Sequence, residues 1–396
     1  MRIALIFDGL QIGGIERVGA DYAKLIQELG HNVYIVNLNP SLKDMDSEFP
    51  NECKRIDIRF PRKICPEQYA QLIKTSYIGR FIYPIMSIVL SFFIILYRFL
   101  VHFRLRKEKT FDLAIAFSGH FNDLSFVAYD MINSRTKLCW LHGALYSYIL
   151  TSDGFLNLYR KIKKLVVLVD DAQEEALTYN HISDLKIYKI YNPTSISDHK
   201  VDDNKVKSLS EKYGKFAVMV SRFKYPHKDQ FTVAESIRIL KEKYNVDLNL
   251  VFVGDGPDKD NVINFVNSFD NDTRSHIFFE GSQTDVQNYY SSAYILLHAS
   301  VAGEGLPTVM IESLSYDLPM VVTDSKTGPR EILGNNEYGL LCKIKDPSDM
   351  AEKIYSLISN NDLYMEYKNK SKKRLNDFLP STIKGKLSYL LQDVMH

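Results

Sequence analysis

The chain has 396 residues, of which 45% are hydrophobic and 24% are charged, so we expect two globular domains with substantial hydrophobic cores. A formal net charge of +1 at pH 7 does not favour a nucleic-acid-binding protein. The four cysteines show neither the spacing of metal ligands nor a disulfide framework, which favours a reducing compartment.

The first residues predict a βαβ unit with a glycine turn. Arg2–Phe7 is a continuous apolar run, as in buried parallel strands, and a helix over 15–29 and a strand over 32–37 follow it. The first run is too short for a signal peptide and lacks a cleavage site, which favours cytosolic residence. Gly13 and Gly14 form either a tight turn or a point where the backbone approaches a ligand. Their spacing is not the Gly-x-Gly-x-x-Gly of dinucleotide-binding turns.

Five more strand-like runs predict one doubly wound α/β domain that ends near Asn192 and Pro193. The runs cover 55–60, 111–117, 137–142, 165–169 and 186–191, and helical segments separate most of them. The stretch from Lys54 to Lys109 contains twelve Lys or Arg residues and three acidic residues. A basic region of this density can attract the anionic headgroups of a membrane.

The apolar segment 81–103 interrupts the alternation of strands and helices. Its uncharged part, Phe81–Tyr97, has 17 residues, which is short for a membrane span, and basic residues flank it on both sides. The segment can form a helix that is buried or covers a domain, or a helix that lies in the membrane interface. A true span is the least favoured reading, because insertion would split the sheet of the first domain.

The second half of the chain has the same βα rhythm without a sequence repeat. Residues 194–212 are polar and charged and predict a linker with a short helix. Strands are expected at 216–220, 248–253, 276–280, 294–298, 320–323 and 339–342, and a helical tail follows from 348. Asp229 is a candidate N-cap for a helix over 230–243. We therefore predict a first domain at 1–193, a linker at 194–212, a second domain at 213–378 and a final helix within 379–396.

Ligands of open α/β sheets bind beyond the carboxyl ends of the strands, where the loops of the second domain gather. These loops cover 221–228, 254–257, 281–282, 302–305 and 324–331. Arg222 and Lys228 can hold a diphosphate between a planar guanidinium and a mobile ammonium, or they are solvated surface cations. Gly254 and Gly256 permit close approach of the backbone to a ligand, or they form a plain turn.

The stretch 300–312 combines two carboxylates with the start of a helix. Glu304 lies in a loop between two glycines, and Glu312 lies eight residues later, on the helix that is expected after a proline. The N–H groups of a first helical turn can bind a phosphate, and the two carboxylates can reach hydroxyls beside it. This geometry suits a sugar nucleotide. The alternative is an ordinary strand–turn–helix with a loop glutamate and a buried or capping glutamate.

Together these motifs resemble those of the family 4 retaining glycosyltransferases, and the resemblance covers essentially the whole chain. It implies an α/β fold of the GT-B type, in which two doubly wound, Rossmann-like domains face a cleft and a C-terminal helix crosses back to the first domain. The first domain would bind the acceptor and associate with the membrane, and the second would bind the nucleotide sugar. The motifs that carry it are Glu-x7-Glu at Glu304 and Glu312, the pair Arg222 and Lys228, Gly-x-Gly-Pro at Gly254–Pro257 and Gly-Gly-x-Glu-Arg at Gly13–Arg17.

The resemblance implies transfer of a hexose or N-acetylhexosamine, with retention of configuration, from a nucleotide-diphosphate sugar, with a UDP-sugar as the first choice. The stretch 323–341 is similar to relatives that extend lipid-linked oligosaccharides for capsule, exopolysaccharide or protein glycans, so we expect a polyprenyl-diphosphate-linked acceptor. The chain would act in the cytoplasm, bound peripherally to the inner face of the cell membrane through 77–107. No metal or other cofactor would be required, since two cations and a helix N-terminus would neutralise the diphosphate.

The roles of four side chains carry over from the family motifs. Arg222 and Lys228 would neutralise the departing diphosphate. Glu304 would hold sugar hydroxyls, and Glu312 would hold the hydroxyls of the ribose. Further donor contacts are expected at Gly13, Gly14, Gly254, Gly256, Gly281, Gly305 and Leu306, with residues 281–285 lining the base pocket.

A histidine of the first domain faces the sugar in this family. We expect His142, in Trp-Leu-His-Gly, to take this position, with His120 as a competing candidate. A strand-end histidine can instead be purely structural. Gly303 stands where many relatives carry a bulkier residue, which concerns the shape of the sugar pocket and not the reaction.

Two other functions remain open from the sequence. A sugar-nucleotide epimerase can use the same two-domain fold, and conversion of a UDP-sugar without any acceptor would favour it. A glycosyltransferase-like subunit without catalysis would normally lack the site residues, whereas Arg222, Lys228, Glu304 and Glu312 are all present here.

Overall fold

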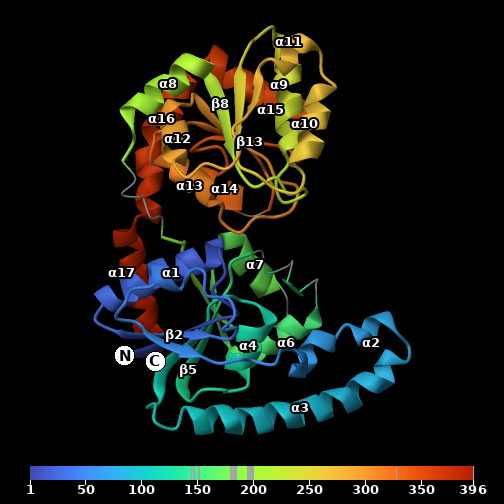
Figure 1. The fold of residues 1–396 in the computed structure, drawn as a ribbon, viewed down its shortest axis with the longest axis vertical. Coiled ribbons are helices and arrows are strands. Elements are labelled where there is room, and N and C mark those ends of the chain that lie inside the picture. The colour runs from blue at the N-terminus through green and yellow to red at the C-terminus, as the bar shows by residue number, and fades with distance from the viewer. Residues whose placement is uncertain are drawn as a thin grey trace. The chain divides into compact units, whose positions relative to one another are not determined.

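The computed structural model describes residues 1–143, 145, 148–149, 152–178, 185–193, 200–326 and 328–395. The chain divides into two compact units, the first Met1–Pro193 with Pro380–His396 and the second Thr194–Leu379. Each unit holds one parallel β-sheet with helices on its faces (Figure 1). Helix α8 (Asp203–Tyr213) belongs to the second unit, so the predicted linker 194–212 supplies part of that unit.

The sheet of the first unit has seven parallel strands in the order β3-β2-β1-β4-β5-β6-β7. The strands predicted at 55–60, 137–142, 165–169 and 186–191 end earlier in the structure. Buried apolar residues such as Ile58 and Leu141 continue past the last strand residue, which made these runs look longer in the sequence. Their bounds are β1 Arg2–Phe7, β2 Asn32–Asn37, β3 Lys54–Asp57, β4 Phe111–Ala116, β5 Ser134–Trp140, β6 Lys164–Val167 and β7 Lys186–Lys189.

The C-terminal helix α17 (Pro380–Asp393) belongs to the first unit, as predicted. It lies beside α1 (Gly14–Glu28), where Lys384 Nζ is 2.9 Å from a Glu28 carboxylate oxygen (Figure 1). At its end, Tyr188 Oη donates to Asp393 at 2.6 Å. The other helices of this unit are η1 Asp46–Glu48, η2 Arg62–Ile64, η3 Pro66–Tyr69, α2 Leu72–Thr75, α3 Gly79–Arg104, α4 Phe121–Ala128, α6 Asp153–Ile162 and α7 Asp170–Thr178.

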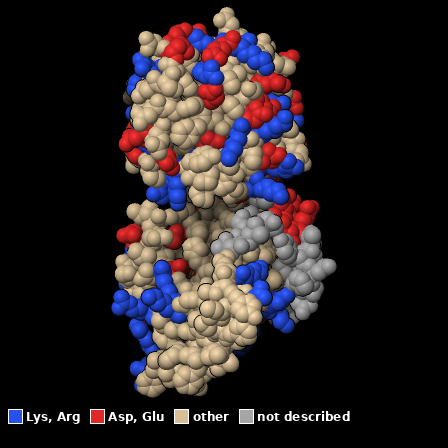
Figure 2. Space-filling model, turned by 90° about the vertical axis from the view of Figure 1, so that its right-hand side faces the viewer, with Lys and Arg blue, Asp and Glu red and all other residues tan. Residues whose placement is uncertain are grey.

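Helix α3 contains the apolar segment 81–103 and runs along the outside of the first unit (Figure 1). It is long and apolar enough to cross a membrane by length and composition, yet only 11% of its most apolar window is buried. The interpretation as a buried helix is therefore wrong. One narrow face packs on the unit through Ile94 and Val101, and the remaining faces expose large apolar side chains such as Ile88 and Phe92. The end of the unit that α3 covers is largely uncharged, with Lys and Arg beside it (Figure 2).

The second unit has six parallel strands in the order β10-β9-β8-β11-β12-β13. The bounds are β8 Phe216–Val220, β9 Asn249–Val253, β10 Ile277–Phe279, β11 Ile295–His298, β12 Met320–Thr323 and β13 Leu340–Cys342. The helices after α8 are α9 Gln230–Tyr244, α10 Lys259–Asn267, α11 Asn271–Arg274, α12 Val286–Ser292, α13 Thr308–Leu314, α14 Gly328–Leu333, α15 Pro347–Ser359, α16 Asn361–Leu375 and η5 Asn376–Phe378. The order of the strands reverses between β8 and β11, which is where ligands of such sheets bind.

Candidate functional site

The predicted loops of the second unit lie at one edge of its sheet, because all its strands are parallel and each loop follows a carboxyl end. The loop after β8 packs directly on the loop after β11: the N–H groups of Val301 and Ala302 both donate to the Pro226 carbonyl, at 3.0 and 3.1 Å. Asp229 caps α9 as predicted, since its carboxylate accepts from Thr232 N at 3.1 Å. These bonds fix where Lys228 and Glu304 stand.

Glu304 and Lys228 form an ion pair that also includes His298. The Lys228 ammonium bonds to one carboxylate oxygen of Glu304, and His298 Nε2 lies 3.0 Å from the other. Lys228 Nζ and His298 Nε2 are 3.3 Å apart. The His298 side chain is fully buried and that of Glu304 is 11% exposed, so water screens the group weakly. The structure thus brings two predicted site residues together.

The electrostatics of this group keep Glu304 ionised. Burial by itself would raise its pKa, but His298 and Lys228 outweigh burial and lower the pKa to about 2. Burial, followed by the Lys228 charge, lowers the pKa of His298. The imidazole is therefore neutral near pH 7, and its Nε2–H donates to the carboxylate. Its buried Nδ1 has no hydrogen-bond partner in the described part of the chain.

His298 was not predicted as a site residue. It is the last residue of β11, and it precedes Glu304 by six positions. In the sequence it looks like the end of an apolar strand. The sequence held one sign of its role, namely a polar side chain where a buried strand meets a glycine loop. Only the structure shows that His298 orients Glu304.

Arg222 occupies the same loop as Lys228 and is exposed, so a ligand can reach its guanidinium from solvent. The next residue, Phe223, is fully buried and anchors the loop, and its N–H donates to the Asp255 carbonyl at 3.0 Å. An arginine with an anchored backbone and an exposed side chain is suited to bind an anionic ligand.

The glycines of the edge loops allow the loops to pack on one another. A Cβ at Gly254 would lie 2.0 Å from the Ser221 carbonyl oxygen, and one at Gly256 would lie 2.2 Å from that of Phe223. Gly303 is similar, with the Lys326 carbonyl oxygen at 2.3 Å from its would-be Cβ. Close loop packing therefore explains these glycines, while their contact with a ligand stays a prediction. Gly281 adopts φ +69°, and its carbonyl accepts from Gly254 N at 2.7 Å.

Glu312 stands on α13, which begins directly after Pro307. The buried Tyr290 donates from its hydroxyl to Glu312 at 3.0 Å and so orients this carboxylate. Gly305 and Leu306 lie between the two glutamates, and the Leu306 side chain is buried, which seats this turn on the core. The helix ends at Leu314.

In the first unit, Gly13 caps α1 and Gly14 is its first residue, so both stand at the start of a helix after β1. Arg17 N donates to the Gly13 carbonyl at 3.2 Å. His142 follows β5 and donates from Nε2 to the Phe117 carbonyl at 2.7 Å. Burial lowers the pKa of His142 to about 4, so the ring is neutral near pH 7 with Nδ1 as acceptor.

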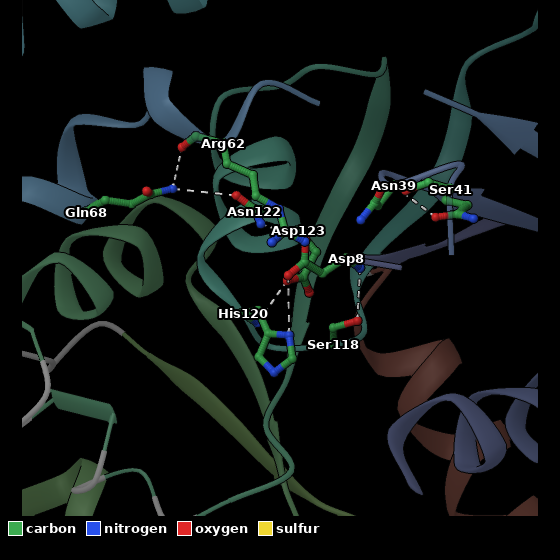
Figure 3. Close-up of polar contacts among 10 residues, drawn as sticks. Asp8, Asn39, Ser41, Arg62, Gln68, Ser118, His120, Asn122 and Asp123 are labelled. Atoms are coloured by element: carbon green, nitrogen blue, oxygen red, sulfur yellow. Dashed lines mark hydrogen bonds and ion pairs between the residues drawn. The ribbon is translucent and has the colours of Figure 1, made fainter. Parts of the chain in front are cut away.

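His120, the competing histidine, belongs to a set of four residues that we call the Asp8 cluster: Asp8, Arg62, His120 and Asn122 (Figure 3). Asp8 follows β1, and its carboxylate accepts from Asn122 Nδ2 at 2.6 Å and lies 3.2 Å from an Arg62 nitrogen. His120 Nδ1 lies 3.6 Å from the other Asp8 oxygen. The neighbouring Asp8 carboxylate raises the pKa of His120. Of these four, only His120 was singled out from the sequence.

Residues 200–374 match the family model described as glycosyl transferases group 1. An uncharacterized glycosyltransferase of Haemophilus influenzae is 26% identical over 279 residues, which cover 69% of this chain and 74% of that protein. The N-acetylgalactosamine-N,N'-diacetylbacillosaminyl-diphospho-undecaprenol 4-alpha-N-acetylgalactosaminyltransferase of Campylobacter jejuni is 31% identical over 150 residues, which cover 38% of this chain and 40% of that protein.

Among solved structures, Anabaena Alr3699/HepE in complex with UDP has the same fold, with a TM-score of 0.74. Its sequence is 17% identical, and the match covers 99% of this chain and 100% of that one. At this identity the likeness concerns the fold alone. With two Rossmann-like units and a family model that matches residues 200–374, this chain is similar to the glycosyl transferases group 1 family and has the GT-B architecture.

Proposed function

We propose that the chain is a retaining glycosyltransferase that moves a hexose or N-acetylhexosamine from a UDP-sugar to a polyprenyl-diphosphate-linked glycan. The observation that carries this proposal is the buried group of Glu304, Lys228 and His298 at the ligand-binding edge of the second sheet, with Arg222 exposed in the same loop as Lys228. A carboxylate held ionised and two nearby cations suit a sugar that carries a diphosphate.

In this proposal the diphosphate draws Lys228 away from Glu304, because it carries more negative charge than one carboxylate. Arg222 completes the pair of cations. Glu304 keeps its bond to His298, and the oxygen that Lys228 leaves accepts sugar hydroxyls. Glu312, oriented by Tyr290, holds the ribose hydroxyls.

In the transfer itself, the bond between the anomeric carbon and the diphosphate oxygen breaks. An acceptor oxygen bonds to that carbon from the same face, and its hydroxyl proton passes to the departing diphosphate. Cations beside the diphosphate stabilise the charge that develops on the leaving group.

The membrane part of the proposal rests on α3. Its exposed apolar residues include Phe81, Ile85, Ile88, Phe92, Phe99 and Phe103, each at least 64% exposed. A contiguous exposed apolar surface of this kind marks a membrane or protein interaction site. Arg80, Arg98 and Arg104 flank or interrupt this face, and the helix contains no acidic residue. A bilayer with anionic lipids satisfies both features, whereas a second copy would bring like charges together.

The surface position of α3 fits a helix that lies in the plane of the membrane. Tyr97 donates from its hydroxyl to the Arg59 carbonyl at 2.6 Å, and His102 Nε2 bonds to the Asp130 carbonyl at 2.9 Å. These contacts hold the helix sideways on its unit. We therefore propose peripheral attachment to the cytoplasmic face of the cell membrane.

The test begins with thermal shift of the full chain in UDP-GlcNAc, UDP-GalNAc, UDP-glucose, UDP-galactose and GDP-mannose, since a ligand of the folded state raises the melting temperature. UDP release is then measured with vesicles that contain undecaprenyl-diphosphate-linked N-acetylglucosamine, and NMR of the product reports the anomeric configuration. Lys228→Ala should abolish release, whereas Lys224→Ala, an exposed lysine of the same loop, should not. Transfer by both Lys228→Ala and Glu304→Gln at the wild-type rate would refute the site assignment, and an inverted product would refute retention.

A further inference from the structure

The Asp8 cluster lies at the carboxyl edge of the first sheet, where the strand order reverses between β1 and β4 (Figure 3). Hydrogen bonds to two buried side chains, Ser118 and Asp123, fix its two loops. Asp8 N donates to Ser118 Oγ at 3.1 Å, and the Asp123 carboxylate accepts from Gly119 N and His120 N at 2.8 Å each. The supports are buried, while the His120 side chain is 42% exposed and that of Asp8 is 18% exposed. The cluster is therefore rigid and open to a ligand.

The chemistry of the cluster suits a neutral sugar. Asp8 supplies carboxylate oxygens that accept hydrogen bonds, and His120 and Arg62 supply N–H groups that donate them. Each sugar hydroxyl can do both, so it fits between an acceptor and a donor. A metal ion is not the expected ligand, because no three His, Cys, Asp or Glu side chains among the described residues are grouped to hold one.

The cluster is joined to the apolar helix α3 by the segment 59–69. Arg62 in η2 and Gln68 in η3 reach into the cluster: Arg62 pairs with Asp8, and Gln68 Nε2 donates to Asn122 at 3.5 Å. The same segment packs on α3, where the Phe60 and Tyr97 rings lie 5.8 Å apart. One short segment thus touches both the proposed sugar ligands and the proposed membrane helix.

This segment is also basic. Arg59, Arg62 and Lys63 are exposed, and the one acidic residue of 59–69, Glu67, is buried and paired with Lys161 at 2.9 Å. Three kinds of surface are therefore joined in sequence: the apolar helix α3, the basic segment 59–69 and the Asp8 cluster with its proposed sugar ligands. A lipid, a diphosphate and a sugar follow each other in the same order in a lipid-diphosphate-linked saccharide.

We propose that the Asp8 cluster binds the sugar nearest the diphosphate of a lipid-linked acceptor, that Arg59 and Lys63 contact the diphosphate, and that α3 lies in the membrane that holds the lipid. This inference rests on the proposed function, and it assigns the acceptor to named residues of the first unit.

The experiment measures flotation of the full chain with three kinds of phosphatidylcholine–phosphatidylglycerol vesicle. The first contains no further lipid, the second contains undecaprenyl diphosphate, and the third contains undecaprenyl-diphosphate-N-acetylglucosamine. The wild type should bind the third about tenfold more tightly than the second, as expected for hydrogen bonds to charged groups. Asp8→Asn and His120→Asn should lose the tenfold preference for the third vesicle over the second. Both variants should still bind the first two kinds of vesicle as the wild type does.

His31→Asn is the matched control, since His31 lies in the same unit and bonds to the chain terminus instead of the cluster. This variant should keep the full tenfold preference for the third vesicle over the second. The inference is overturned when the wild type does not distinguish the second and third vesicles, or when Asp8→Asn and His120→Asn still do so. Thermal shift with UDP-sugars is measured in parallel on every variant. If UDP-sugars do not raise the melting temperature of the wild type, the proposed donor chemistry is refuted. The flotation result then tests the acceptor site independently.

Discussion

Replacing Glu304 by glutamine tests the charged group at the centre of the proposed donor site. The variant keeps the size of the side chain and removes the charge that pairs with Lys228. It also leaves His298 beside a neutral amide. We expect loss of both stability and transfer, because the same carboxylate orders the loop and holds the sugar.

The size of the stability loss follows from the pKa of Glu304. Its fall from the ordinary 4.5 to about 2 corresponds to about 3 kcal/mol of folding free energy at neutral pH. Because the folded-state pKa is the lower one, this contribution is present above pH 4.5 and is lost as the pH falls towards 2. For a unit of this size, the melting temperature should fall by about 5–10 °C at pH 7.

The assay is urea denaturation of the wild type and Glu304→Gln at several pH values between 7 and 2.5. Unfolding is monitored by far-UV circular dichroism. The free-energy difference should shrink steadily below pH 4.5. Glu242→Gln is the matched control: Glu242 pairs with Arg238 in the same unit but is 54% exposed, so its loss should stay within about 0.5 kcal/mol. A Glu304→Gln variant as stable as the wild type at pH 7, or a difference that does not change with pH, would refute the ion pair.

Three further changes test other parts of the molecule. Arg222→Ala should weaken UDP-sugar binding about tenfold or more in a titration without lowering the melting temperature, because this exposed side chain acts only on a ligand; an unchanged affinity would contradict its role. Gly256→Ala should destabilise the second unit by about 1–3 kcal/mol in urea, because its Cβ would lie 2.2 Å from a carbonyl oxygen. Gly385→Ala, with no atom nearby, should be neutral or stabilising. Ile88→Glu with Phe92→Glu should abolish vesicle flotation while UDP-sugar binding persists, and retained flotation would exclude α3 as the membrane contact.

Much of the fold and part of the candidate site could be predicted because they depend on local patterns. Strand-like runs predicted the place of each strand, and Asp229 predicted the start of α9, since capping needs only a side chain and the turn that follows it. The loops of the second unit could be gathered at one edge because parallel strands put their carboxyl ends together. Glu304 and Lys228 were therefore expected near each other although 76 residues separate them.

What the sequence could not decide depends on contacts between distant segments. The role of His298 arises only when β11 brings its imidazole to Glu304, and Asp8 gains its partners only when η2 and α4 meet the end of β1. The glycines at 254 and 256 read equally well as ligand contacts, because their carbonyl neighbours belong to another loop. For α3, composition allowed both a buried and an exposed helix. Tertiary packing decided for exposure, since only one narrow face of the helix finds apolar partners on its unit.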